Sequence, residues 1–239
     1  MTIDDDLMTD VLGWDVATWS TAARFWERMV EPMVGPLDVL EVGAGPGGPS
    51  LWLALQGHRV VCSNLDHTET QARPLHERYG VADRVEYLDL DVADLPYENH
   101  FDLVVFKSVL GGIPHGGREL QREALQQLHK VLKPGGRLIF AENLRGTPLH
   151  RLARSVAYRR RGVPKWQYLR LRDLREFLRD FRDVKIGATG VLALFGRSES
   201  QRQSLARADV RFWNRMVPAS WHYVVYGSAV KGAAGTAVK

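Results

Sequence analysis

The stretch that decides the fold is LDVLEVGAGPGG, residues 37–48. Its first six residues form a short apolar run with β-branched side chains, which is typical of a buried parallel strand. Four glycines follow within six positions, so the backbone can turn sharply and a ligand can approach it closely. Residues 49–55 then read as a helix that begins with proline, a residue tolerated in a first turn. Strand, glycine turn and helix together predict a site for a nucleotide-sized ligand.

Two kinds of ligand fit this glycine turn. Gly43, Gly45 and Gly48 satisfy the G-x-G-x-x-G spacing of dinucleotide-binding folds, a pattern that is weak by itself. The wider string EVGAGPG, residues 41–47, resembles motif I of the class I S-adenosylmethionine-dependent methyltransferases. The resemblance implies that four residues of the turn contact this methyl donor: Glu41, Gly43, Gly45 and Gly47. The acid favours the methyl donor, because a carboxylate would repel a pyrophosphate but attract the methionyl ammonium.

Length and composition indicate a globular protein. The chain has 239 residues, of which 45% are hydrophobic and 25% charged, and this suits one α/β domain with additions. Cys62 is the single cysteine, so an internal disulfide is excluded and a reducing compartment is indicated. No apolar run reaches membrane-spanning length, and the acidic N-terminus does not resemble a signal peptide. We therefore expect a cytoplasmic protein without a membrane span.

Later segments resemble the same methyltransferase family. FDLVVF, residues 101–106, is similar to its central strand, and LKPGGRLIF, residues 132–140, is similar to the entry into its fifth strand, which we expect at 137–143. The resemblance covers about residues 37–140. It implies an α/β fold with a doubly wound, Rossmann-like sheet of seven strands, the last of them antiparallel. We expect the sixth and seventh strands at 184–189 and 221–230.

We expect residues 1–239 to form one methyltransferase domain with two additions. Residues 1–30 are interpreted as an N-terminal helical cap, or lid, in which Trp19 or Trp26 covers the cationic sulfonium of the methyl donor. The alternative is that these aromatic side chains pack on the sheet.

Residues 144–182 are interpreted as a helical insertion after the fifth strand. In this family such an insertion builds the acceptor pocket. Trp166 and Tyr168 within it are expected either to bind the acceptor or to fill a hydrophobic joint.

The resemblance implies further contacts to the methyl donor where strands end. In the family an acid after the second strand bonds the ribose hydroxyls. Here Asn64 holds the usual position and Asp66 follows two residues later, so either residue could serve. Asp91 and Val92 match the loop that holds the adenine ring. Lys107 falls at the carboxyl end of the fourth strand, where open α/β sheets bind ligands.

The chemistry requires few catalytic groups. A sulfonium methyl group is already activated, so the protein has to align the acceptor and, for a hydroxyl, remove its proton. His115 and Glu142 are the expected bases. A divalent cation such as Mg²⁺ could instead acidify the hydroxyl, with Glu142 and Asn143 as oxygen ligands. Asn143 could also hold a polar acceptor directly.

The acceptor is inferred from resemblance alone. AENL, residues 141–144, and LFGRSE, residues 194–199, are similar to small bacterial methyltransferases of saccharide and polysaccharide synthesis. The resemblance implies O-methylation of a sugar or oligosaccharide. The alternative is another small metabolite, methylated on oxygen or nitrogen.

The net charge of +4 is concentrated in arginines between residues 145 and 175. These arginines form either a docking surface for a phosphate or acidic polymer, or a solvated helix face paired with acids. No RNA-binding motif is visible, so nucleic acid is disfavoured as a partner. A homo-oligomer is compatible with the sequence.

Overall fold

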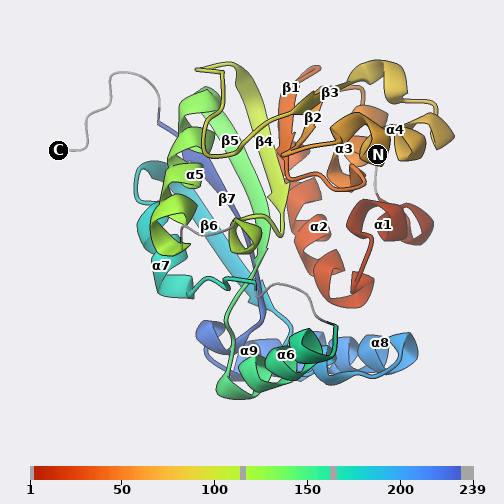
Figure 1. Ribbon diagram of the computed structural model, residues 1–239, viewed down its shortest axis with the longest axis vertical. Coiled ribbons are helices and arrows are strands. Elements are labelled where there is room, and N and C mark those ends of the chain that lie inside the picture. Colours follow the sequence, from red (N-terminus) through yellow and green to blue (C-terminus); the bar gives the residue numbers. More distant parts are fainter. Residues whose placement is uncertain (1–2, 114–116, 162–165, 233–239) are drawn as a thin grey trace.

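A seven-stranded sheet lies at the centre of the molecule (Figure 1), with strand order β3-β2-β1-β4-β5-β7-β6. The structure is a computed structural model that describes residues 3–113, 117–161 and 166–232. β7 runs antiparallel to both of its neighbours, β5 and β6, whereas the pairs among β1 to β5 are parallel. The predicted doubly wound sheet with an antiparallel last strand is therefore confirmed.

The elements follow the order expected from the sequence. The strands are β1 Asp38–Val42, β2 Arg59–Asn64, β3 Val85–Asp89, β4 Phe101–Lys107, β5 Leu132–Asn143, β6 Phe181–Thr189 and β7 Val224–Lys231. The main helices are α1 Asp5–Leu12, α2 Val16–Val30, α3 Gly48–Leu55, α4 Thr68–Arg78, α5 Gly117–Val131, α6 Pro148–Arg161, α7 Leu171–Phe177, α8 Glu199–Ala208 and α9 Asn214–Met216. Within the described residues, no helix is long and apolar enough to cross a membrane.

Helices cover both faces of the sheet. α1, α2, α3 and α4 pack on one face around one hydrophobic cluster, and α5 and α7 pack on the other face around a second cluster. α6, α8 and α9 gather at the end of the sheet toward which β4 points (Figure 1). The two clusters bury the apolar side chains that alternate along the central strands.

The glycine turn joins β1 to α3 as predicted. Gly45 has a positive φ of 54°, a conformation that side-chain-bearing residues rarely adopt. Gly48 is constrained by packing instead, because a Cβ at this position would lie 2.2 Å from the carbonyl oxygen of Val11 at the end of α1. The turn is therefore pressed directly against the N-terminal helices.

Strand β5 differs from the expectation. It begins at Leu132, directly after α5, rather than at Arg137, so the Lys-Pro-Gly-Gly segment belongs to the strand. Leu132 pairs with Phe101, and the register shifts before Leu103 pairs with Arg137. The other boundaries move less: β6 begins at Phe181, inside the predicted insertion, and β7 covers 224–231.

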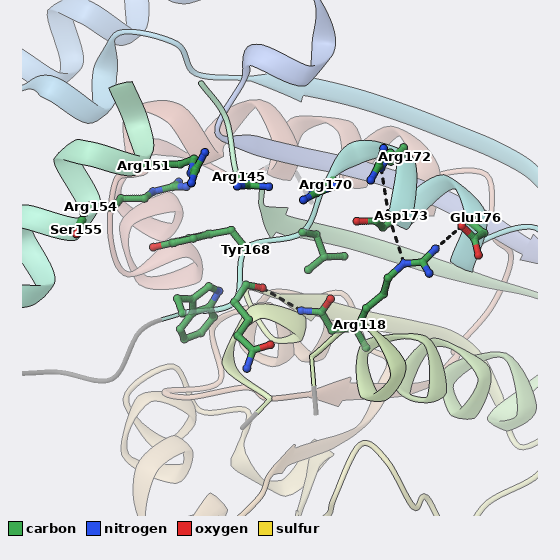
Figure 2. A pocket seen from close by; sticks show the side chains of 14 residues that line it. Arg118, Arg145, Arg151, Arg154, Ser155, Tyr168, Arg170, Arg172, Asp173 and Glu176 are labelled. Carbon is green, nitrogen blue, oxygen red and sulfur yellow. Dashed lines mark hydrogen bonds and ion pairs between the residues drawn. The ribbon is translucent and has the colours of Figure 1, made fainter. Parts of the chain in front are cut away.

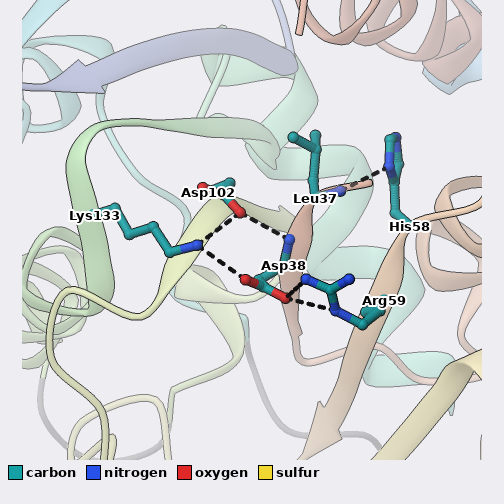
Figure 3. A network of polar contacts seen from close by, with 6 residues as sticks. All are labelled: Leu37, Asp38, His58, Arg59, Asp102 and Lys133. Carbon is teal, nitrogen blue, oxygen red and sulfur yellow. Dashed lines mark hydrogen bonds and ion pairs between the residues drawn. The ribbon is translucent and has the colours of Figure 1, made fainter. Parts of the chain in front are cut away.

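A polar network explains why this segment stays beside the sheet (Figure 3). The ammonium of Lys133 lies 2.9 Å from a carboxylate oxygen of Asp38 and 2.9 Å from one of Asp102. Asp38 also accepts from the guanidinium of Arg59, and Asp102 accepts from the backbone N–H of Asp38 at 2.9 Å. These residues stand at the amino ends of β1, β2, β4 and β5, so the network fixes strand register at the end of the sheet opposite the glycine turn.

Candidate active site

A cavity of about 780 Å³ opens where β1, β4 and β5 end. The glycine turn and residues 10–15 form one side of it, and Lys107, Ser108 and Asn143 stand at the strand ends. Trp166, Tyr168, Ala193, Leu194 and Gly196 also line it. The cavity lies at the carboxyl ends of the parallel strands, the edge at which open α/β sheets bind ligands.

Glu41 fastens the turn and also lines this cavity. Its carboxylate accepts hydrogen bonds from the backbone N–H of Ser50, at 2.7 Å, and from the Ser50 hydroxyl. Burial raises the pKa of Glu41 to about 7, and the Ser50 bonds and the nearby charge of Lys107 act against this rise. The acid predicted beside the glycine turn is thus in place, and it holds β1 to α3.

Lys107 lies against two indole rings that contact each other edge to face. Its ammonium lies 4.7 Å from the ring centre of Trp14 and 4.8 Å from that of Trp19. Burial lowers the pKa of Lys107 to about 8, against the opposing influence of Glu41, Glu142 and then Asp15. The cation that these indole faces hold in this structure is the chain's own lysine.

The N-terminal tryptophans are placed differently from the prediction. Trp19 and Trp26 are fully buried, and the indole N–H of Trp26 donates to the carbonyl of Phe140 at 3.1 Å. Neither lines the cavity, whereas Trp14, which the sequence reasoning passed over, does. Helices α1 and α2 are therefore part of the hydrophobic core, as the alternative interpretation expected, and Trp26 is not placed to cover a ligand in the cavity. Contact of Trp19 with the methyl donor stays a prediction. The position of Trp14 directly after the helix break at Gly13 was the available signal.

The two residues predicted to bind the ribose lie in different surroundings. Asn64 is buried and bonds through its side-chain amide to the backbone N–H and carbonyl of Gly45. Asp66 is exposed just beyond β2. Gly47 faces away from the cavity, since a Cβ there would lie 2.7 Å from the His76 ring. The turn therefore presents Gly43 and Gly45 to the cavity, and Gly47 serves the packing behind it.

The predicted adenine loop lies outside the residues that line the cavity. The Asp91 carboxylate accepts from the backbone N–H of Ala93 at 2.9 Å, which is an Asx turn. Val92 packs against the hydrophobic cluster beneath α5. Their contact with adenine stays a prediction.

Glu142 does not face the cavity. One carboxylate oxygen accepts from the backbone N–H groups of Val109 and Leu110 at 2.8 and 2.7 Å, and the other accepts from that of Asn143 at 2.7 Å. Burial is the main influence on its pKa, which rises to about 7 although these bonds lower it. With both oxygens bonded to backbone amides, the geometry does not support Glu142 as a base or as a metal ligand.

The predicted metal site receives no support elsewhere. Asn143 lines the cavity and donates from its side-chain amide to the Ser108 hydroxyl at 2.6 Å. Nowhere in the described parts of the chain do three or more His, Cys, Asp or Glu residues gather so that they could hold a metal ion. His115, the other predicted base, lies outside the described residues.

Trp166 and Tyr168 line both this cavity and a second one of about 930 Å³. Figure 2 shows Tyr168 in the second cavity. The Trp166 ring packs against Gly111 and Gly112, where a Cβ would overlap it. The Tyr168 ring lies 3.9 Å from the guanidinium carbon of Arg154, which also lines both cavities. The prediction that these aromatics stand at the acceptor side is consistent with their position and stays a prediction.

Comparison with known proteins finds similar sequences for the central part of the chain. Residues 40–140 match the model of a family described as "Methyltransferase domain". The demethylmenaquinone methyltransferase of Clavibacter sepedonicus is 34% identical over 130 residues, which are 54% of this chain and 46% of that protein. The tRNA 5-carboxymethoxyuridine methyltransferase of Escherichia coli K12 is 31% identical over 152 residues, 60% of this chain and 56% of that protein. The chain thus spans about half the length of the curated relatives it matches.

Solved structures support the fold. Phosphoethanolamine N-methyltransferase 2 of Haemonchus contortus, solved with S-adenosyl-L-methionine, aligns over 95% of this chain and 56% of its own, with a TM-score of 0.63 and 18% identity. The 1,6-didemethyltoxoflavin-N1-methyltransferase of Burkholderia thailandensis aligns over 93% of this chain and 81% of its own, with a TM-score of 0.57 and 19% identity. Residues 40–140 are therefore similar to a methyltransferase domain, and the fold of the chain is similar to that of these solved methyltransferases.

Proposed function

We propose that the protein transfers the methyl group of S-adenosylmethionine to a small-molecule acceptor. The observation that carries the proposal is one cavity that joins the glycine turn and Glu41 to polar side chains at the ends of β4 and β5. At Gly45 an added Cβ would meet no heavy atom within 4 Å, so a ligand can approach the backbone there. The buried Glu41 carboxylate suits the cationic methionyl end of the methyl donor.

The acceptor atom that we propose is a hydroxyl of a sugar or oligosaccharide. Asn143 and Ser108 offer amide and hydroxyl groups of the kind that bind such acceptors. Another small metabolite is the alternative. Two relatives are named as a ubiquinone/menaquinone C-methyltransferase and a sarcosine/dimethylglycine N-methyltransferase. Carbon and nitrogen acceptors are therefore alternatives to the hydroxyl.

Lys107 is the proton acceptor that we propose for a hydroxyl. It lines the cavity next to Ser108, and because its pKa is lowered to about 8, part of it is neutral at neutral pH. The bound sulfonium supplies an activated methyl group. Neutral Lys107 takes the hydroxyl proton at Nζ while the acceptor oxygen forms its bond to the methyl carbon and sulfur keeps the electron pair. Asn143 orients the acceptor oxygen.

The test is release of S-adenosylhomocysteine from S-adenosylmethionine across a panel of sugars, phenols, amines and RNA. We expect turnover with a hydroxylated small molecule and calorimetric binding of S-adenosylhomocysteine. Binding of a nicotinamide dinucleotide in its place would contradict the proposed function.

A further inference from the structure

The second cavity is strongly basic (Figure 2). Six arginines and two carboxylates line it. The two carboxylates belong to Asp173 and Glu176, and both are paired: Arg118 contacts Asp173 at 3.3 Å and also Glu176, and Arg172 contacts Asp173 at 3.6 Å. These arginines fit the simple expectation of a solvated helix face with its charges neutralised.

Three other arginines do not fit that expectation. Among the ion pairs within the described residues, none involves Arg145, Arg151 or Arg170. The like charge of Arg151, followed by burial and by Arg170, lowers the pKa of Arg145, so Arg145 lies close to two other cations. Figure 2 shows them along one wall of the cavity.

The backbone brings these charges together from three places in the sequence. Arg145 follows β5, Arg151 lies in α6 and Arg170 directly precedes α7. Leu144 and Leu169 form an isolated parallel bridge, and the N–H of Arg145 donates to the carbonyl of Leu169 at 2.8 Å. Like charges that the fold holds together repel one another, and an anion at the same place would relieve that repulsion.

We propose that Arg145, Arg151 and Arg170 bind a phosphate ester group of the acceptor. This inference rests on the proposed function, because it places the reactive atom of the same molecule in the neighbouring cavity. Guanidinium groups bind phosphate oxygens through paired N–H donors. A single carboxylate would leave most of the cluster's charge unbalanced, whereas a phosphate monoester or a diphosphate supplies two or more negative charges. A phosphorylated sugar combines this group with the proposed hydroxyl.

Arg154 has a different role in this arrangement. It donates to the carbonyl of Leu144 at 2.6 Å and lies over the Tyr168 ring, so it fixes the wall between the two cavities. The acceptor would pass over Tyr168 and Trp166, which line both spaces. The anion site and the methyl-transfer site thus lie next to each other and share the residues between them.

The first experiment uses inorganic pyrophosphate as the probe, titrated by calorimetry into the full chain. The variants are Arg145→Gln, Arg151→Gln and Arg170→Gln. The matched control is Arg179→Gln, because Arg179 is exposed and, among the residues that the structure describes, forms one long ion pair, with Asp180 at 3.9 Å. We expect each of the three variants to weaken pyrophosphate binding about tenfold, and the control to change it less than about twofold. Absence of binding to the wild type, or equal losses in the control, would overturn the proposal.

The second experiment separates this proposal from the proposed function. S-adenosylhomocysteine affinity is measured in every variant and should stay at the wild-type value. If the wild type binds pyrophosphate but not S-adenosylhomocysteine, the proposed function fails and the anion site stands. A short RNA that binds more tightly than pyrophosphate, with a steep loss at high salt, would replace the small phosphate ester by a nucleic acid and overturn the inference.

Discussion

The side-chain amide of Asn64 bonds to both backbone polar groups of Gly45, accepting from its N–H at 2.7 Å and donating to its carbonyl at 3.2 Å. The end of β2 is thereby tied to the middle of the glycine turn. The position at which the family resemblance calls for a ribose-binding acid is therefore used here to hold the turn in shape. An amide can do this because it offers both a donor and an acceptor.

Replacing the Asn64 amide by the family's acid should weaken ligand binding. In Asn64→Asp the side chain can no longer donate to the Gly45 carbonyl, and a carboxylate would face that oxygen. We expect S-adenosylhomocysteine affinity to fall about tenfold, measured by calorimetry, since losing a buried hydrogen bond and leaving a repelled charge costs on the order of 1–3 kcal/mol. Tighter binding by Asn64→Asp would show that residue 64 contacts the ribose directly.

Asp66 is the acid that remains available for the ribose. It is exposed just after β2. We expect Asp66→Asn to weaken S-adenosylhomocysteine binding about tenfold, because an amide accepts hydrogen bonds from two hydroxyls less well than a carboxylate does. Thermal melting should stay close to that of the wild type. An unchanged affinity would remove Asp66 from the site.

A substitution at Gly45 tests whether the glycine turn binds the ligand. Gly45→Val should reduce S-adenosylhomocysteine affinity by about a hundredfold or more, because the side chain would fill the space through which a ligand approaches the backbone. Gly80→Val is the matched control: Gly80 also has a positive φ, 66°, and open space around its Cβ position, but it lies after α4, away from the cavity. Both variants carry similar backbone strain, so equal losses of affinity would mean that strain alone is responsible.

The lowered pKa of Lys107 predicts how turnover depends on pH. Its folded-state pKa of about 8 lies below the ordinary lysine value, so the neutral form that can accept a proton grows as pH rises through 8. We expect turnover at saturating substrate to rise about tenfold between pH 7 and pH 9, as the titration of one group with this pKa requires. Lys107→Met should turn over slowly with a flat profile over this range. A wild-type rate in Lys107→Met would assign the proton to another acceptor, with His115 the first to examine.

Glu142 predicts a pH dependence of stability. Its pKa is about 7 in the fold and 4.5 as the ordinary reference, so the folded protein binds this proton more tightly than the unfolded chain does. The resulting stabilisation is fully present below pH 4.5 and is lost as pH rises to about 7, which adds to the melting temperature at pH 5.5 relative to pH 8. Glu142→Gln should remove this contribution and melt several degrees lower at both pH values. The melting temperature falls because the glutamine places an amide NH₂ group, which is a donor, among backbone N–H donors. Turnover at a temperature well below melting should fall little; a loss of turnover without a loss of stability would return Glu142 to catalysis.

The backbone of the fold was predictable because its signals are local. An apolar run that ends in glycines and a helix that starts with proline are each complete within a few residues, and 37–55 folds as they indicate. Strand β5 was mispredicted at its start because Lys133 is held by Asp38 and Asp102, which come from distant strands.

The site was harder to predict because side-chain direction is not a local property. The sequence shows that Glu142 ends a strand, but only the fold reveals that the amides of Val109 and Leu110 stand where its carboxylate points. Trp14 was missed for the same reason, since its contact with Lys107 joins segments far apart in the chain.

The contact of Gly48 with the Val11 carbonyl bears on how small molecules enter and leave the protein. Helices α1 and α2 could not swing aside without exposing Trp19 and Trp26 to water, at a cost of about 2–3 kcal/mol for each side chain. Leu194 and Gly196 also border the cavity, and we expect this part of its lining to yield when a small molecule enters or leaves. The segment that follows β6 would then move during ligand exchange, and the N-terminal helices would stay fixed.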